Sequence, residues 1–277
     1  MDKKRLAVIT GCDSGIGKSL CKILLSNGYS TAISYLNDNP FSGEKEVFAL
    51  KMDLRIGDEI SSFAEFIAEL CQTGYYLDTF ISNAGIALGG PVENIPMKLV
   101  REVLEVNFFG AFLLTQKLIP LLIESKGGIY IIGSTGGRIA LPFLSPYTSS
   151  KFALEGFCES LRREMKPFGV RTVMIEPGGI ATPIWNKGKE QDSSFIDKKY
   201  MKSMTALKDT IIDGGNYGLP PDEAASMILK VIQKKNPGPR YVIARKDLPN
   251  YAPLFIPKRI MDKIIGNLLK MDYGQKV

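Results

Sequence analysis

The fold is decided by the stretch Leu6-Ala7-Val8-Ile9-Thr10-Gly11-Cys12-Asp13-Ser14-Gly15-Ile16-Gly17. Here an apolar strand runs directly into a glycine-rich turn that opens a helix. Such glycines let the backbone turn sharply and approach a pyrophosphate, which binds to the N–H groups and the positive dipole end of the helix. The spacing G-x-x-x-G-x-G differs from the G-x-G-x-x-G of the usual dinucleotide fingerprint. A tight strand-to-helix turn that binds nothing is the alternative interpretation.

Beyond this turn, short apolar runs alternate with segments of helical period, which is typical of βαβ units and a parallel sheet. The strands expected from these runs are 6–9, 31–35, 47–51, 79–82, 128–132, 170–175 and 240–243. The helices expected between them are 15–27, 57–72, 97–125, 147–167 and 221–234. Together they predict an α/β fold: one doubly wound domain over residues 1–250 with a seven-stranded parallel sheet. Only 18 positions separate Tyr35 from Asp53, so a shortened loop is expected there in place of a crossover helix.

Two segments lie outside this alternation. Residues 187–219 are polar at both ends around one amphipathic patch, which predicts a lid over a ligand site. The tail, residues 251–277, carries apolar residues spaced along one face of a helix, namely Ile260, Ile264, Ile265, Leu268 and Leu269. They are interspersed with Lys258, Arg259, Lys263 and Lys270. This C-terminal extension is expected either to lie at an anionic membrane surface or over the substrate entrance, or to pack on its own domain or a partner subunit.

Composition excludes several classes of chemistry. The 277 residues contain no histidine, which excludes Ser-His-Asp and Cys-His nucleophile systems and His-ligated zinc, and no metal site is expected. The four cysteines, Cys12, Cys21, Cys71 and Cys158, form no CxxC pair and are expected to be reduced thiols in the core.

The net charge and the lengths of the apolar stretches limit which partners and which cellular compartment are expected. The net charge is +6, but the basic residues are scattered, so no nucleic-acid partner is predicted; an anionic small ligand or an acidic membrane surface explains the charge as well. The longest uncharged stretch, residues 23–37, is 15 residues long, short of the roughly 20 that span a bilayer. The apolar run near the N-terminus is too short for a secretory signal. A cytoplasmic protein, with peripheral membrane contact as an option, is expected.

A second constellation indicates acid/base chemistry. Tyr147 and Lys151 are four positions apart, and on a helix they share one face. An ammonium within about 4 Å of the phenol would favour the phenolate by about 4 kcal/mol, or about 3 pK units, at an effective dielectric of about 20. Ser134, at the end of a strand, would hold the substrate oxygen against the phenol. The alternative is an ordinary amphipathic helix.

Taken together, these motifs resemble the short-chain dehydrogenase/reductase family in order and spacing over about residues 5–245. The matching features are Thr-Gly-x-x-x-Gly-Ile-Gly at 10–17, Asn83-Ala84-Gly85, Asn107, Ser134, Tyr147-x-x-x-Lys151 and Pro177-Gly178. A looser resemblance is to the hydroxysteroid and retinol dehydrogenase branch of the family. It rests on the residue sequence of the glycine turn, on Pro239-Arg240-Tyr241 and on the tail at 256–262. The resemblance implies a Rossmann-type fold and an NAD(P)-dependent enzyme that interconverts an alcohol and a ketone as a homodimer or homotetramer.

The resemblance also implies a role for each matching residue. Tyr147 would be the general acid or base, Lys151 would lower its pKa and hold the nicotinamide ribose, and Ser134 would orient the carbonyl. Asn107 would hold a water that links Lys151 to solvent. The cofactor would be bound by Gly11, Asp13, Ser14, Gly15, Ile16, Gly17, Tyr35, Asp53, Leu54, Asn83, Ala84, Gly85, Tyr147, Lys151, Pro177, Gly178, Ile180 and Thr182.

Cofactor choice normally rests on the residue that ends the second strand, where an acid selects NAD and a base selects NADP. Tyr35 and Leu36 carry neither signature. Asp13 is expected to face the ribose hydroxyl and repel the extra phosphate, which favours NAD weakly over NADP.

The expected substrate wall is apolar, so it suits an apolar secondary alcohol or ketone that is steroid-, retinoid- or lipid-like. Its residues are Ile86, Ala87, Leu88, Ile139, Ala140, Leu141, Phe143, Leu144 and Trp185. The alternative is that several of them are core. The rival functions are reduction of a small carbonyl compound and a non-catalytic dinucleotide-sensing regulator. A regulator would be expected to lose Tyr147 or Lys151, and both are present.

Overall fold

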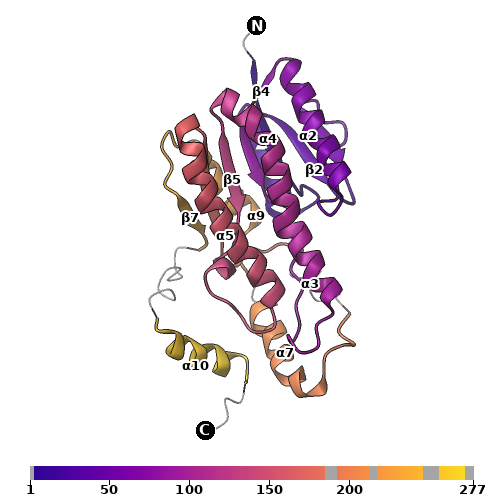
Figure 1. The fold of residues 1–277 in the computed structure, drawn as a ribbon, viewed down its shortest axis with the longest axis vertical. Coiled ribbons are helices and arrows are strands. Elements are labelled where there is room, and N and C mark those ends of the chain that lie inside the picture. Colours follow the sequence, from indigo (N-terminus) through magenta and orange to yellow (C-terminus); the bar gives the residue numbers. More distant parts are fainter. Residues whose placement is uncertain (1–2, 185–191, 213–216, 246–255, 272–277) are drawn as a thin grey trace.

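Seven parallel strands form one sheet in the computed structural model, which describes residues 3–184, 192–212, 217–245 and 256–271 (Figure 1). The strands are β1 (Lys4–Ile9), β2 (Ser30–Tyr35), β3 (Val47–Lys51), β4 (Tyr75–Ser82), β5 (Gly128–Ile132), β6 (Arg171–Pro177) and β7 (Arg240–Ile243). Their order across the sheet is β3-β2-β1-β4-β5-β6-β7, with every neighbouring pair parallel. The predicted α/β, doubly wound, Rossmann-type fold is confirmed.

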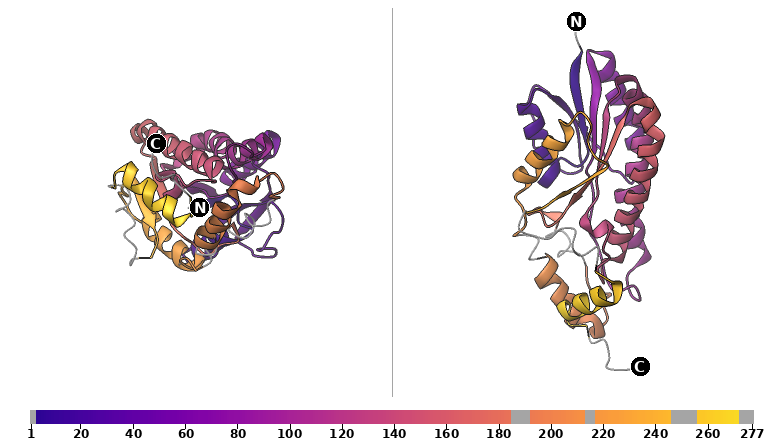
Figure 2. Two further views of the ribbon diagram at one scale, coloured as in Figure 1. Left: turned by 90° about the horizontal axis from the view of Figure 1, so that it is seen from below. Right: turned by 90° about the vertical axis from the view of Figure 1, so that its left-hand side faces the viewer.

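Helices cover both faces of this sheet (Figure 2). One face carries α2 (Gly57–Gln72), α4 (Gly110–Ser125) and α5 (Ser145–Met165), and the other carries α1 (Gly15–Ser26) and α9 (Pro221–Ile232). Side chains alternate along each strand, so Leu6 and Val8 of β1 pack under the first set of helices while Ala7 and Ile9 pack under the second. Both faces are therefore apolar, as a parallel sheet requires.

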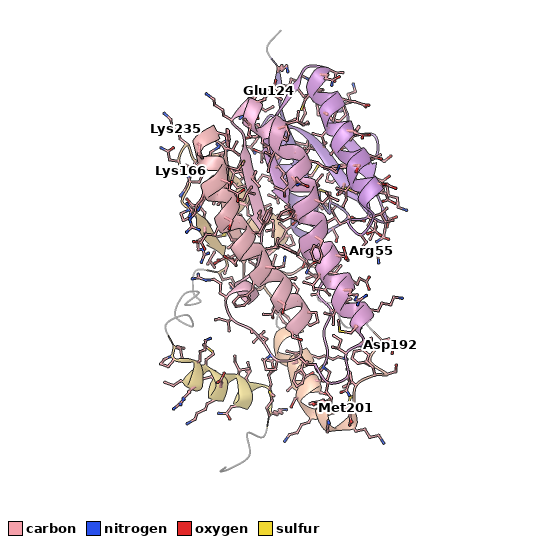
Figure 3. The ribbon with its side chains drawn as sticks, viewed as in Figure 1. Arg55, Glu124, Lys166, Asp192, Met201 and Lys235 are labelled. Atoms are coloured by element: carbon pink, nitrogen blue, oxygen red, sulfur yellow. The ribbon has the colours of Figure 1, made fainter. Side chains whose placement is uncertain are left out.

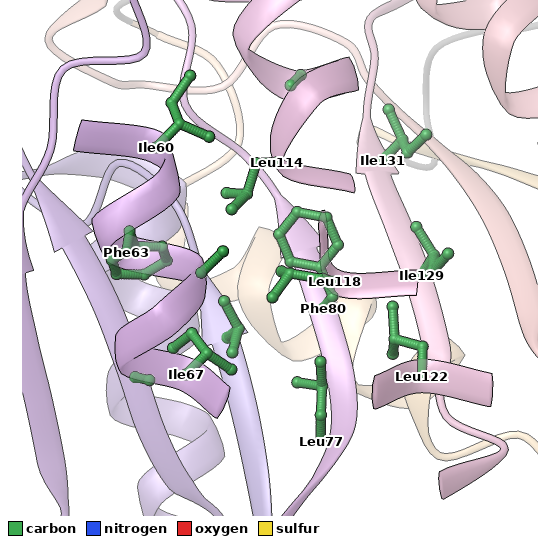
Figure 4. Packing of buried hydrophobic residues seen from close by; sticks show 14 of the residues in the cluster. Ile60, Phe63, Ile67, Leu77, Phe80, Leu114, Leu118, Leu122, Ile129 and Ile131 are labelled. Atoms are coloured by element: carbon green, nitrogen blue, oxygen red, sulfur yellow. The ribbon is translucent and has the colours of Figure 1, made fainter. Parts of the chain in front are cut away.

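The larger core lies between β4, β5 and the helices α2 and α4 (Figure 4). Phe63 and Ile67 of α2 meet Leu118 of α4 above Phe80 of β4, and each of these side chains is fully buried. Burial of one such side chain contributes roughly 1.5–3 kcal/mol relative to leaving it exposed. This packing fixes the strands whose carboxyl ends carry the site described below.

The strand order reverses beside β1, which pairs with β2 on one side and with β4 on the other. The segments that leave β1 and β4 therefore run to opposite faces, and a crevice opens at the carboxyl ends of these strands. Residues 36–46, between β2 and β3, contain no helix, which confirms the predicted short loop. Leu36 and Asn37 of this loop line the crevice.

The predicted helix over residues 97–125 is interrupted. It consists of α3 (Met97–Leu104), a π-helical turn (Glu105–Phe109) and α4. By length and composition the whole segment, Met97–Ser125, could cross a membrane. The sequence estimate missed it because it counted uncharged stretches only. Leu114, Leu118 and Leu122 are nevertheless buried against the sheet, as in the core helix of a soluble protein.

A third apolar cluster lies at the end of the molecule where α7 (Met201–Leu207) and α10 (Lys258–Leu268) meet (Figures 2 and 3). Helix α7 falls within the predicted lid and α10 within the predicted C-terminal extension. Met204 and Leu207 of the first pack with Ile265 and Leu269, from α10 and the residue after it, and with Phe143. Part of the tail is thus packed on its own chain. The remainder of the lid, 187–191 and 213–216, and tail residues 251–255 and 272–277 lie outside the described residues.

Candidate active site

The glycine turn after β1 forms the floor of the site. Gly11 and Gly15 have positive φ values of 70° and 57°, a conformation that side chains with a Cβ rarely adopt. Gly17 is packed so closely that a Cβ there would lie 2.3 Å from the Gly11 carbonyl oxygen. The turn thereby directs the N-terminus of α1, with its free N–H groups, toward the crevice.

Residues after β4 clamp this turn. The Thr10 hydroxyl accepts hydrogen bonds from the backbone N–H of Asn83 and of Ala84, at 2.9 and 3.0 Å. The Asn83 side chain donates to the carbonyls of Thr10 and Gly11, at 2.8 and 3.2 Å. Thr10 and Asn83 thus tie the two strand ends that flank the crevice, and Asn83 acts here as a brace of the turn.

A cavity of about 350 Å³ occupies the crevice, within the range of small-molecule sites. Of the residues predicted to bind cofactor, all except Gly17 line it. Gly17 lies behind the turn. The lining also includes residues that the sequence reasoning did not assign, namely Ser34, Leu36, Asn37, Met52, Arg55, Glu102, Val106, Ile132, Gly133, Pro183 and Ile184. Leu36, Asn37, Met52 and Gly133 follow strand ends, which was the available signal for these four.

Ser134, Tyr147 and Lys151 meet at one end of the cavity. Ser134 caps the short turn Thr135–Gly137, because its Oγ accepts from the Gly136 N–H at 3.0 Å. Tyr147 and Lys151 lie one turn apart on α5, as the spacing predicted. The Lys151 Nζ, on a side chain that is almost fully buried, donates to the Ile132 carbonyl at 3.1 Å.

The expected effect of Lys151 on Tyr147 is not found. The Lys151 Nζ lies 5.7 Å from the centroid of the Tyr147 ring, and the pKa of Tyr147 is raised by burial. A hydrogen bond with Ser134 opposes this rise in the Tyr147 pKa. Burial also lowers the pKa of Lys151 to about 8. Burial therefore decides the pKa of Tyr147 in this structure, and the lowering of that pKa by Lys151 stays a prediction, since the Lys151 ammonium donates to the Ile132 carbonyl.

Asn107 lies in the π-helical turn and is buried. Its Oδ1 accepts from the Ile86 N–H at 2.8 Å, and its Nδ2 donates to the Ile86 carbonyl and to the Ser150 Oγ, each at 2.9 Å. The amide therefore fastens the segment after β4 to α5. π-Helical turns are frequent at functional sites, and this one turns Asn107 toward α5. A water held by Asn107 stays a prediction.

Two carboxylates of the predicted cofactor site have protein partners. Asp13 accepts from the N–H groups of Leu36 and Asn37, at 3.1 and 2.8 Å, and so holds the loop after β2. Asp53 is paired with Arg55 at 2.6 Å, which lowers the pKa of that carboxyl (Figure 3). The expectation that Asp13 faces a ribose hydroxyl did not anticipate these bonds, because its partners are more than 20 positions away.

The predicted substrate wall is divided. Ile86, Ala87 and Leu88 line the cavity. Leu141 and Leu144 do not line it, and neither does Phe143, which has a φ of 66°; all three belong to the apolar cluster with α7 and α10. The core alternative therefore describes these residues better. Trp185 lies outside the described residues.

The four cysteines are free and buried, as predicted. Burial raises the pKa of Cys12 and Cys21, that of Cys21 to about 11, so these thiols are protonated at neutral pH. None of the four lines the cavity.

Comparison with known proteins identifies this arrangement. The family model of short chain dehydrogenases matches residues 5–193. The chain belongs to the short-chain dehydrogenase family. A NADPH-dependent 3-dehydrocapnine reductase from Ornithobacterium rhinotracheale is 35% identical over 96% of this chain and 98% of its own length. The mitochondrial D-beta-hydroxybutyrate dehydrogenase of Rattus norvegicus is 33% identical over 76% of this chain and 69% of its own.

A solved structure agrees with the family assignment. The short-chain dehydrogenase from Streptomyces avermitilis superimposes with a TM-score of 0.77 over 98% of this chain and 97% of its own, at 20% identity. At that identity the match supports the fold. With the family shown, the chain is an NAD(P)-dependent oxidoreductase acting on CH–OH groups. The likeness to the hydroxysteroid and retinol branch stays a prediction.

Proposed function

We propose that Ser134, Tyr147 and Lys151 form the acid/base centre with which this short-chain dehydrogenase interconverts an apolar secondary alcohol and its ketone. The observation that carries the proposal is that all three side chains line one cavity, where Tyr147 and Lys151 lie one turn apart on α5 and Ser134 is held by the Gly136 N–H. Bound NAD(P) supplies or accepts the hydride. Tyr147 gives its proton to the developing alkoxide during reduction and removes the hydroxyl proton during oxidation.

The residues on the cavity wall fit such a cofactor. The turn that contains Gly11 and Gly15, with the N-terminus of α1, offers backbone N–H groups for a pyrophosphate. Any Cβ at Gly11 would lie 2.8 Å from Ala84 Cα, so the turn admits a ligand only with a glycine there. Lys151 would hold the ribose nearest the reacting atoms, and Pro177–Gly178 would border the nicotinamide.

Each member of the acid/base centre has a part that its contacts support. The Ser134 hydroxyl, aligned by the Gly136 N–H, orients the substrate oxygen beside the phenol. Lys151 keeps a buried positive charge near the phenol, anchored to Ile132, and this charge stabilises negative charge that develops on Tyr147. Asn107 positions the segment after β4, and with it Ile86 of the substrate wall.

The substrate class follows from the wall beside this centre. Ile86, Ala87, Leu88 and Ile184 border the cavity and carry no charge. An apolar steroid-, retinoid- or lipid-like carbinol therefore loses less hydration on entering than a sugar or a phosphorylated acid would. The relative from Ornithobacterium rhinotracheale is named a reductase of 3-dehydrocapnine, which supports reduction as one direction of the reaction.

A matched substrate series tests the proposal. NADH and NADPH consumption is measured with ketones of increasing apolar size and with polar ketones of equal size. The apolar series is expected to show a kcat/KM that rises at least tenfold with chain length. A preference for small polar carbonyls would contradict the substrate class and favour the small-carbonyl alternative. Dinucleotide binding with no turnover of any carbinol or ketone would favour the sensing alternative.

A further inference from the structure

Four charged side chains gather directly behind the acid/base centre. Arg240 Nη2 lies 2.7 Å from Glu155 Oε2, and its Nε lies 3.5 Å from Glu176 Oε1. Arg138 Nη1 lies 3.5 Å from Glu176 Oε2. Glu176 is completely buried, and the Glu155 side chain is 13% exposed. Buried charges of this kind are costly unless they are well paired.

The pairing within this group is incomplete. Glu155 Oε1 and Glu176 Oε1 are buried and have no hydrogen-bond donor among the described residues. An ionised carboxylate only accepts hydrogen bonds, so if Glu155 and Glu176 were both ionised, neither could donate a hydrogen bond to the other. A single proton supplies the missing donor, because a protonated carboxyl can donate to its neighbour. Burial, the Glu176 charge and hydrogen bonding with Glu176 all raise the pKa of the Glu155 carboxyl, which favours its protonated form.

The group connects the segments that carry the site. Glu155 lies one turn beyond Lys151 on α5, and Arg138 directly follows the turn that Ser134 caps. Glu176 precedes Pro177, which lines the cavity. The Ser134 turn also packs on α5, since a Cβ at Gly137 would lie 3.3 Å from Glu155 Cγ.

We propose that Glu155 and Glu176 share one proton and, held by Arg138 and Arg240, position the Ser134 turn against α5 and the end of β6. These are positioning residues, since none of the four lines the cavity. The effect on turnover rests on the proposed function, whereas the shared proton does not.

The proton is held in the neutral range. Burial and the Glu176 charge raise the pKa of Glu155 to about 7, against the lowering effect of Arg240 and Arg138. The groups that face Glu155 are Glu176 on β6, Arg240 on β7, Arg138 after the Ser134 turn and the Cys158 thiol on its own helix. Above about pH 7 two carboxylates remain, and their repulsion loosens the contact with the Ser134 turn.

The shared proton is tested first by thermal unfolding between pH 5 and 8, in Glu155→Gln and wild type. A carboxyl whose pKa is raised on folding stabilises the protein below its unfolded pKa, and this stabilisation is lost as the pH rises through the folded pKa. As the pH rises from 5 to 8, the thermal unfolding midpoint of Glu155→Gln should therefore increase by several degrees relative to the midpoint of wild type. Glu159→Gln, which alters an exposed partner of Arg163, should follow the wild-type curve. Parallel curves for all three proteins would overturn the proposal.

Infrared spectroscopy of the wild-type protein keeps the proposal testable if Glu155→Gln does not fold. A protonated carboxyl band should persist at pH 6 and vanish as the pH rises through about 7. A spectrum in which no carboxyl titrates above about pH 5 would overturn the proposal.

The positioning role is tested by the pH profile of kcat. Between pH 6 and 7, below the pH at which Lys151 loses its charge, wild type and Glu159→Gln should lose a measurable part of kcat as Glu155 loses its proton, while Glu155→Gln stays level over this range. A Glu155→Gln profile identical to wild type would overturn the positioning role. Absence of turnover from wild type would contradict the proposed function instead, and divergent thermal curves would still support the shared proton.

Discussion

Lys151 is the residue whose charge the site depends on most, because its ammonium is buried and anchored to the Ile132 carbonyl. We expect Lys151→Met to lower kcat by about 10²-fold or more and to weaken dinucleotide binding, since one ammonium serves both the phenol and the ribose. Lys166→Met, an exposed change at the end of the same helix (Figure 3), should leave both unchanged. If Lys151→Met left both kcat and dinucleotide affinity unchanged, Lys151 would not be part of the site.

The same residue predicts a pH dependence. Burial lowers the pKa of Lys151 to about 8, so the ammonium is present below that pH and is lost as the pH rises through it. The kcat/KM should therefore fall above about pH 8 in the wild-type protein. Lys151→Arg keeps its charge at these pH values, so whatever rate it retains should not fall there. A wild-type profile that stays level to pH 10 would contradict this expectation.

Asp13 tests the choice between NAD and NADP. Its carboxylate holds the loop after β2 through the N–H groups of Leu36 and Asn37. Asp13→Asn keeps one acceptor oxygen and removes the charge, so we expect the ratio of the two dissociation constants to move severalfold toward NADP. Asp13→Ser removes the charge and shortens the side chain, so its oxygen no longer reaches both N–H groups, and it should weaken the binding of both cofactors. If Asp13→Asn affects NAD and NADP equally, its charge does not take part in the choice.

At the scale of elements, the contact between the glycine turn and α1 is the tightest in the site. A Cβ at Gly17 would lie 2.3 Å from the Gly11 oxygen and 2.6 Å from Asn83 Nδ2. Gly17→Ala should therefore displace the turn, weaken dinucleotide binding at least tenfold and cost about 1–3 kcal/mol of folding free energy. Isothermal titration and thermal unfolding measure the two effects.

Gly156→Ala is the matched control, because a Cβ there meets open space on α5. It should stabilise the protein by about 0.5–1 kcal/mol and leave binding unchanged. Equal binding by Gly17→Ala and Gly156→Ala would show that the turn does not hold the dinucleotide.

Sequence predicted those elements whose signal is local. The alternation of Leu6, Ala7, Val8 and Ile9 predicted a strand buried on both faces, and the spacing of Tyr147 and Lys151 predicted one helix face. These patterns depend on the period of the structure, which the chain carries in every few residues.

The contacts that sequence missed are long-range. Nothing near Phe143 indicates that Leu269 packs with it, or that Asp13 bonds to a loop more than 20 positions away. The π-helical turn at Asn107 also departs from the helical period, although none of its own residues, Glu105–Phe109, is a glycine or proline and only Gly110 follows it. These features depend on tertiary contacts, and the periodicity of apolar residues along the chain does not predict which distant residue a side chain contacts.

At the scale of the whole molecule, α10 carries the exposed apolar and basic side chains that the predicted peripheral membrane contact would use. Ile260, Ile264 and Leu268 are spaced four apart and are 51%, 48% and 43% exposed, beside the exposed Lys263 and Arg259. We expect wild type to sediment with anionic vesicles and Ile264→Gln to bind them severalfold less, without loss of fold. Ile56→Gln, at a similarly exposed residue that precedes α2, should bind as wild type.

A point variant is sharper here than truncation after Asn250. Truncation would uncover the buried partners of Leu269 and Ile265, so it would confound membrane contact with loss of packing. If wild type does not sediment with anionic vesicles, α10 is structural and the membrane contact is absent.

The central claim, that Tyr147 is the acid/base of a dehydrogenase, is tested most directly by Tyr147→Phe. This change deletes the transferable proton and leaves the glycine turn intact. Turnover and dinucleotide affinity are measured together, with Tyr217→Phe, which alters a tyrosine that is 83% exposed, as the control. The account predicts a loss of kcat of about 10²-fold or more in Tyr147→Phe with dinucleotide affinity unchanged. Turnover within tenfold of wild type would contradict it.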